Sequence, residues 1–132
     1  MAYEISISGY ALVSRDVLEN KNYIKYCIKR ETNDEFDSGW IFMSQKNVEK
    51  GILVRDDLEV IPYIDIINNV FEPTLYIYNM PVGTELQVIN EFGRYFFVDN
   101  NSLQKIDLEK YLSFPVGSSI ETALVKREGL LN

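Results

Sequence analysis

The sequence predicts a single α+β domain with a mainly antiparallel, curved sheet, covered by one amphipathic helix and a short second helix. Three observations lead to this fold class. Apolar residues alternate with period two in both halves of the chain, and one segment near the middle has them at helical spacing. The 132 residues, 46% of them hydrophobic, suffice for one core. We therefore treat 1–132 as one domain whose last residues, about 127–132, fray.

The first half of the chain predicts three strands. In the first, apolar and small residues alternate with more polar ones, and a polar connection over 14–22 follows that has room for a helical turn. The apolar set of this strand is Ile5, Ile7, Gly9, Ala11 and Val13. The second strand alternates Ile24, Tyr26 and Ile28 with Lys25, Cys27 and Lys29, and we expect its lysine face to be solvated.

An acidic turn leads from the second strand into a third strand around 38–44. We expect these two strands to pair antiparallel across the long loop between them. The pattern weakens over 45–57, where Gly51 is a break and 52–54 is a candidate short strand. Next, Asp56 or Asp57 can cap a helix that carries Pro62 in its first turn. Its apolar residues at helical spacing are Val60, Ile64, Ile67 and Phe71.

The second half predicts extended segments over 75–78, 85–90 and 94–99, the last two joined by a turn at 90–93. A short helix over 107–112, capped by Asp107, and a closing strand over 120–126 follow. Pro-Val-Gly occurs twice, at 81–83 and 115–117, which indicates the same turn chemistry. Most of the nine tyrosines should lie in the core, with Tyr23, Tyr76 and Tyr78 as expected exceptions.

Composition narrows the function classes. The formal net charge of −7 would repel a phosphate backbone, which argues against nucleic-acid binding. The same charge has the right sign for steering a basic protein partner, although the solubility of the protein alone would explain it. No apolar run is long enough to span a bilayer and the N-terminus does not resemble a secretory signal, so we expect no membrane partner and a cytoplasmic protein. A lone Cys27 and the lack of histidine argue against a disulfide scaffold and structural zinc. Cys27 is expected to be a core thiol.

The catalytic inventory is thin. Neither histidine nor a Gly-x-Ser-x-Gly elbow is present, and the glycines lack nucleotide-binding spacing, so we expect no catalytic residue and no cofactor. The densest acidic cluster is Glu31, Asp34, Glu35 and Asp37. An EF-hand loop started at Asn33 would need Gly where Ser38 stands and Glu where Ser44 stands, so no metal site is expected. A solvated turn and a partner-binding surface remain open for this cluster.

The acidic run, the motif Asp37-Ser38-Gly39-Trp40, the aromatic strand after it and Ser44 together resemble the immunity protein 33 family, also described as domain of unknown function 2185. Residues 11–14 and the segment from Pro73 to Thr84 are similar to other parts of that family, so that the likeness covers about 9–98. After the serine, however, this chain has Gln-Lys-Asn at 45–47 where the family continues with Gly-Asp-Glu.

This resemblance implies a non-catalytic bacterial protein of the cytoplasm that binds a cognate toxin and blocks it stoichiometrically. A toxin domain of basic charge would match the acidic loop. The expected partner-binding residues are Asp34, Glu35, Asp37 and Trp40, although Trp40 is equally suited to packing the corner. Two alternatives stay open: a small regulatory or ligand-binding module, and a carboxylate- or metal-dependent enzyme. Oligomeric state does not follow from the sequence.

Overall fold

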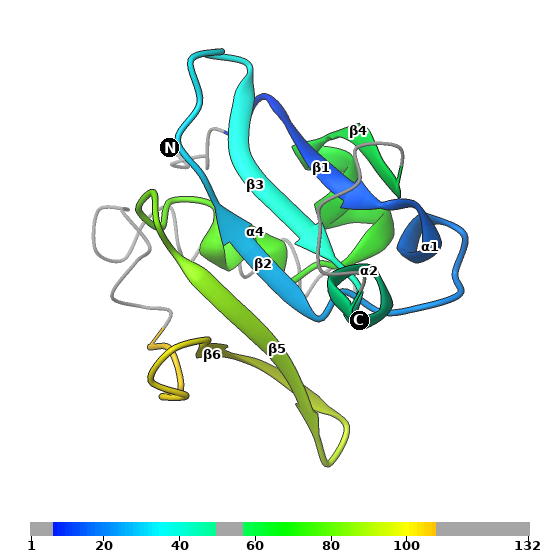
Figure 1. Cartoon of the computed structure of the whole chain (residues 1–132), viewed down its shortest axis with the longest axis vertical. Coiled ribbons are helices and arrows are strands. Elements are labelled where there is room, and N and C mark those ends of the chain that lie inside the picture. The colour runs from blue at the N-terminus through cyan, green and yellow to red at the C-terminus, as the bar shows by residue number, and fades with distance from the viewer. Residues whose placement is uncertain (1–6, 50–56, 108–132) are drawn as a thin grey trace, which may run out of the picture.

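The computed structural model of the chain describes residues 7–49 and 57–107. A six-stranded sheet with strand order β4-β1-β3-β2-β5-β6 forms the frame of this part (Figure 1). The strands are β1 (Tyr10–Ser14), β2 (Tyr26–Lys29), β3 (Asp37–Met43), β4 (Leu58–Pro62), β5 (Glu85–Glu91) and β6 (Arg94–Asp99). The helical segments are short: α1 (Arg15–Leu18), α2 (Gln45–Glu49), α3 (Tyr63–Asp65), the π-helical η2 (Ile66–Val70) and α4 (Thr74–Ile77).

The sheet is mixed, so the α+β class is confirmed but the expected antiparallel order is not complete. The β1–β3 pair is parallel, whereas every other pair of named strands is antiparallel, including the predicted β2–β3 pair. Between Tyr10 and Leu12 the register of β1 on β3 shifts, from Asp37 to Ile41. This irregularity contains Gly39, whose φ of +88° is open to glycine and strained for other residues.

The core lies between the sheet and the helical segments α3, η2 and α4, which cover one face (Figure 1). Ala11 and Val13 are fully buried, as the alternation in β1 predicted; Ile5 lies outside the described residues. Trp40 and Phe42 of β3 stack at 5.7 Å between ring centroids, and Phe42 meets Tyr63 of α3 edge-on. These aromatic contacts tie the helical layer to the middle of the sheet.

The predicted solvated lysine face of β2 is wrong, because that face looks into the helical layer. Cys27 is fully buried there, as expected of a core thiol. The Lys29 ammonium donates to the carbonyl oxygens of Tyr78 at 3.2 Å and Met80 at 2.8 Å, and lies 5.8 Å from the Trp40 ring. The aliphatic part of the Lys29 side chain can lie along apolar surface, because the two backbone carbonyl oxygens accept hydrogen bonds from its ammonium group. Desolvation lowers the pKa of Lys29.

The single amphipathic helix predicted from Asp57 to Phe71 is also wrong. Its first part is the strand β4, which pairs antiparallel with β1, and helical structure begins only at Tyr63. Val60 and Ile64, expected on the buried face, are 60% and 46% exposed. Pro62 explains the change, because proline disfavours helical geometry in the residue before it, and the β-branched residues of this strand favour extended backbone.

The extended segment expected over 75–78 is instead the helix α4, which starts after Pro73. Thr74, Leu75 and Ile77 are buried, whereas Tyr76 and Tyr78 pack against the core in partly buried positions. Of the three tyrosines expected outside the core, Tyr23 alone is strongly exposed, at 82%.

The hairpin of β5 and β6 is confirmed. Glu91 pairs with Arg94, and the two residues between them, Phe92 and Gly93, have φ values of +53° and +76°. Positive φ at both positions is the mark of a type I′ turn. Of the Pro-Val-Gly turns, the first is described: Thr84 donates its amide to Pro81 O at 3.2 Å, and Gly83 has a φ of +94°. The second turn, the segments predicted at 52–54, 108–112 and 120–126, and the tail lie outside the described residues.

Candidate functional site

The acidic loop, residues 31–36, joins β2 to β3 and is fastened by the side chain of Asp34. One oxygen of this carboxylate accepts from the Phe36 amide at 2.9 Å and the other accepts from the Tyr10 hydroxyl at 2.8 Å. These two hydrogen bonds, the amide first, lower the pKa of Asp34. The hydrogen bond to Asp34 in turn raises the pKa of Tyr10. Asp34 therefore stays ionised and holds the loop against β1.

The base of the acidic loop is held by Asp37. Its carboxylate accepts from Arg30 Nη2 at 2.7 Å and from the Gly39 amide at 2.8 Å, and its side chain is only 6% exposed. Trp40 is fully buried and donates its indole N–H to Tyr78 O at 3.2 Å. Asp37 and Trp40 were predicted as partner contacts, but both lie beneath the surface because the loop backbone and the helical layer surround them.

Two of the four predicted site residues thus present exposed side chains, Asp34 and Glu35. Glu31 and the 64%-exposed Phe36 lie beside them in the same loop. Among the described residues no group of three potential metal ligands comes together. What this loop offers chemically is a rigid, negatively charged surface with one aromatic side chain.

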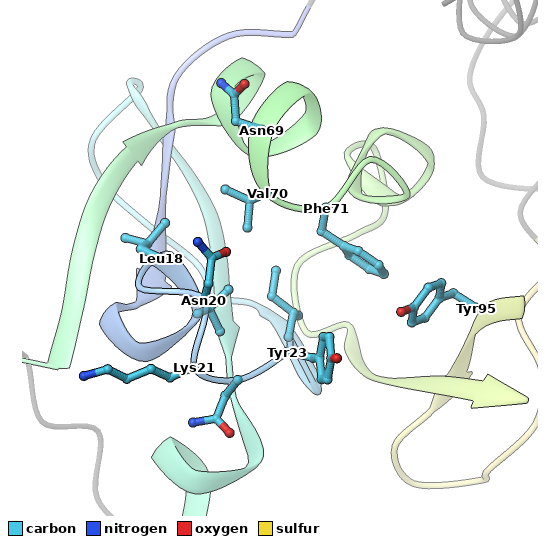
Figure 2. A pocket seen from close by; sticks show the side chains of 11 residues that line it. Leu18, Asn20, Lys21, Tyr23, Asn69, Val70, Phe71 and Tyr95 are labelled. Atoms are coloured by element: carbon cyan, nitrogen blue, oxygen red, sulfur yellow. The ribbon is translucent and has the colours of Figure 1, made fainter. Parts of the chain in front are cut away.

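An aromatic groove of about 660 Å³ lies at the other end of the sheet (Figure 2). Three segments distant in sequence form it: α1 with the loop after it, the end of η2, and β6. Phe71 points toward Tyr95, edge-on at 5.4 Å between ring centroids, and the exposed Tyr23 stands on the rim. The remaining lining residues are Val17, Leu18, Ile24, Asn20, Lys21, Asn22, Asn69 and Val70.

The strand registers place this groove far from the acidic loop. Tyr26, at the start of β2, pairs with Met43 at the end of β3, whereas the acidic loop joins the opposite ends of these strands. Tyr26 also pairs with Gln87, beyond which β5 continues toward the hairpin tip. The start of β2 and the hairpin tip therefore lie at one end of the sheet and the acidic loop at the other (Figure 1).

A polar pocket of about 420 Å³ adjoins the groove and shares Lys21 and Asn22 with it. Within it, one oxygen of Asp16 accepts from Asn22 at 2.8 Å and from the Ser44 hydroxyl at 2.6 Å. The other oxygen of Asp16 and the side-chain oxygen of Asn47 are buried and have no hydrogen-bond partner among the described residues. The other residues that line this pocket are Arg15, Glu19, Lys46 and Asp57.

The sequence interpretation missed most of this end of the molecule. Tyr23 was singled out for exposure, but Tyr95 and Phe71 were assigned to a strand and a helix without a shared role. The local signal available was the run Asn20-Lys21-Asn22-Tyr23, in which two amides flank a charge before an aromatic residue. Positive φ at Asn20, +61°, fits the tolerance of asparagine for that conformation.

No helix in the described residues combines the length and the apolar character that crossing a membrane demands.

Comparison with known proteins places the chain in a family. The family model described as the immunity protein Imm33 domain matches residues 11–99, which is more than half of the chain and runs from β1 to the end of β6. The match includes the acidic loop, the aromatic groove and the polar pocket. No curated protein and no solved structure matches the chain. The chain belongs to the immunity protein Imm33 domain family.

Proposed function

We propose that this protein is a non-catalytic bacterial immunity protein of the cytoplasm that binds a cognate toxin and neutralises it by occupying a surface the toxin needs. The observation that carries the proposal is the family match over residues 11–99. The toxin is a basic protein domain in this proposal, because the chain has a formal net charge of −7.

The acidic loop is the proposed steering surface. Asp34 and Glu35 are exposed, and the hydrogen bonds of Asp34 to Tyr10 and Phe36 fix the loop before binding. A preorganised loop loses less conformational entropy when a partner docks. Exposed carboxylates accelerate encounter with a basic partner more than they strengthen the final complex. Asp37 and Trp40 contribute indirectly in this proposal, by keeping the base of the loop in place.

The proposal is tested with the tagged protein in extracts of its own organism, at low salt and again at high salt. A basic toxin domain should be retained at low salt, and once purified it should lose its toxic activity at a 1:1 ratio with this chain. The double variant Asp34→Asn/Glu35→Gln should bind that domain with an association rate about tenfold lower at low ionic strength. Salt should shrink the difference between the two proteins.

The matched control is Asp65→Asn/Asp107→Asn, which removes the same charge from exposed positions outside the acidic loop, the groove and the pocket. If this control slows association as much as the loop variant, the loop has no steering role. Recovery of no toxin domain, or of one whose activity survives saturation with this chain, contradicts the immunity function itself.

A small ligand-binding module is the second candidate. The aromatic groove favours it, because a volume of about 660 Å³ lies within the range of small-molecule sites and its walls mix apolar and amide groups. If this candidate is right, a small molecule binds in the groove of the purified protein, and the protein does not neutralise a toxin.

A further inference from the structure

We propose that the aromatic groove and the polar pocket form one docking surface for a protein segment that carries an aromatic or aliphatic side chain next to an arginine. The two hollows adjoin each other, since Lys21 and Asn22 line both. The inference rests on the proposed function for the basic character of the partner, and goes beyond it by naming the docking chemistry and a surface opposite the acidic loop.

The groove supplies the apolar half of this surface. Tyr23, 82% exposed, and Tyr95, 47% exposed, stand at its rim, and Phe71 packs edge-on against Tyr95. Tyrosine gives a large contact area with little loss of side-chain freedom, and asparagine adds adaptable hydrogen bonds. Asn20 and Asn69 lie in the same lining. This mixture is typical of surfaces that bind proteins through a few anchoring side chains.

The pocket supplies the polar half, through two buried oxygens of its lining residues for which residues 7–49 and 57–107 provide no donor. One belongs to Asp16, whose other oxygen already accepts two hydrogen bonds, and the second belongs to Asn47, which is 4% exposed. A buried acceptor left without a donor is unfavourable, because it has given up its hydrogen bond to water and received none in return. Both residues are linked through Ser44. Its hydroxyl donates a hydrogen bond to the Asp16 carboxylate and accepts one from the backbone amide of Asn47 at 3.0 Å.

Arginine fits this pair of acceptors better than other donors. Its guanidinium presents five N–H groups in a flat fork and can serve two oxygens of different residues, while a lysine ammonium acts as a point charge. Magnesium or calcium would need more oxygen ligands than these two, and no group of three potential ligands is found in the described residues. A hydrogen bond from arginine to the Asp16 carboxylate is also charge-assisted.

The charges around the pocket are compatible with a cation. Two of its basic residues are already paired, Arg15 with Glu59 and Lys21 with Glu19, each at 3.2 Å. The Lys21 side chain is 70% exposed, and such surface pairs are weak, so that it can move aside to admit a guanidinium. Lys46 is the lining residue that opposes an incoming arginine.

The test is a ¹H–¹⁵N NMR titration of the full chain with N-acetyl-Phe-Arg-amide and with its citrulline counterpart, which keeps the shape but loses the charge. Saturable shifts should appear at Asn22, Tyr23, Asn47 and Tyr95, and the citrulline peptide should bind at least about fivefold more weakly. Tyr23→Ser should weaken binding of the arginine peptide by a similar factor, and Lys46→Gln should strengthen it.

The matched control is Phe36→Ser, which removes an exposed phenyl group, 64% exposed, from the acidic loop at the opposite end. Equal affinity for both peptides, shifts concentrated in the acidic loop, or a Tyr23→Ser protein that binds like the wild type would overturn the proposed docking surface. A Tyr23→Ser protein that still neutralises the toxin with wild-type affinity would do the same, while leaving the immunity function intact. Failure of the wild-type protein to neutralise any toxin would instead contradict the proposed immunity function.

Discussion

Gly39 fixes the geometry of the acidic loop. A Cβ atom at this residue would lie 2.4 Å from the carbonyl oxygen of Arg30, and its φ of +88° is unfavourable for any L side chain. The close approach is used by the fold, because Gly39 O accepts from the Arg30 amide at 2.9 Å and the Gly39 amide donates to Asp37. The base of the loop thus depends on a residue without a side chain.

Gly39→Ala should therefore lower the free energy of unfolding by about 2–4 kcal/mol. About 1–2 kcal/mol comes from the positive φ, and the remainder from displacing the Arg30 backbone, which cannot give way as a side-chain end can. Urea unfolding of both proteins measures the difference. The control is Gly83→Ala, where φ is +94° but nothing lies within 4 Å of the new Cβ, so that only the conformational cost remains.

Equal losses of stability in the two alanine variants would show that the contact with Arg30 is unimportant.

At the scale of residues, the sequence correctly indicated a corner at Asp37-Ser38-Gly39-Trp40 but was misleading about how exposed its side chains are. Trp40, Ile41 and Phe42 follow one another along β3 and are all buried, so the side chains on both faces of this strand are inaccessible to a partner. Composition alone cannot distinguish an aromatic anchor for a partner from one for the core.

At the scale of elements, hairpins were predictable and the helical layer was not. The turn at Phe92-Gly93 has local chemistry that the sequence carries by itself. Residues 58–62, in contrast, fit both a helix start and an edge strand, and only pairing with β1 decides between them. Short apolar runs such as 74–77 are ambiguous for the same reason, since three or four residues hold too few periods to separate helix from strand.

The hairpin yields a stabilising substitution. Phe92 is 97% exposed and has a φ of +53°, a conformation that phenylalanine adopts unwillingly and asparagine tolerates. Phe92→Asn should raise the free energy of unfolding by about 0.5–1 kcal/mol, because Asn-Gly is the favoured pair for a type I′ turn. The midpoint of urea unfolding should move up without a change in slope.

Phe36→Asn is the comparison for this substitution, since it also removes an exposed phenyl group but from a residue without positive φ. A gain of the same size there would attribute the effect to lost surface apolarity, and no gain at Phe92 would contradict the turn argument.

At the scale of the whole molecule, the aromatic groove depends on the topology of the sheet and cannot be recognised from the order of residues in the sequence. The aromatic groove exists because the sheet order places β5 beside β2 and β6 beside β5, so that Tyr95 of β6, Phe71 after η2 and the loop after α1 share one end of the sheet. No pattern within these separate segments predicts that they lie close together in the fold. The acidic loop was visible in the sequence because all of its charges are neighbours in the chain.

The closed core also governs how stability depends on pH. Burial raises the pKa of the Cys27 thiol far above its ordinary value of 9.0, and desolvation is the main cause that raises the pKa of Tyr63 above 10.0. Both groups stay protonated in the folded protein while the unfolded chain ionises them. Their contribution to stability is complete below the unfolded pKa values and is lost as pH rises above them.

Cys27→Ala isolates this effect between pH 9 and 10, where the thiol of the unfolded chain ionises before its tyrosines. The wild type should lose stability more steeply than the variant in this window, with the difference approaching about 1.4 kcal/mol per pH unit. The lowered pKa of Lys29 acts in the opposite direction, since its folded form sheds a proton first, but it is common to both proteins and cancels. The measurement is urea unfolding under reducing conditions at several values from pH 8 to pH 10. The variant is already less stable at pH 8, because a buried side chain is shortened, so the quantity to compare is the slope of the free energy of unfolding against pH. Equal slopes for the two proteins would mean that Cys27 ionises in the folded protein as readily as in the unfolded chain.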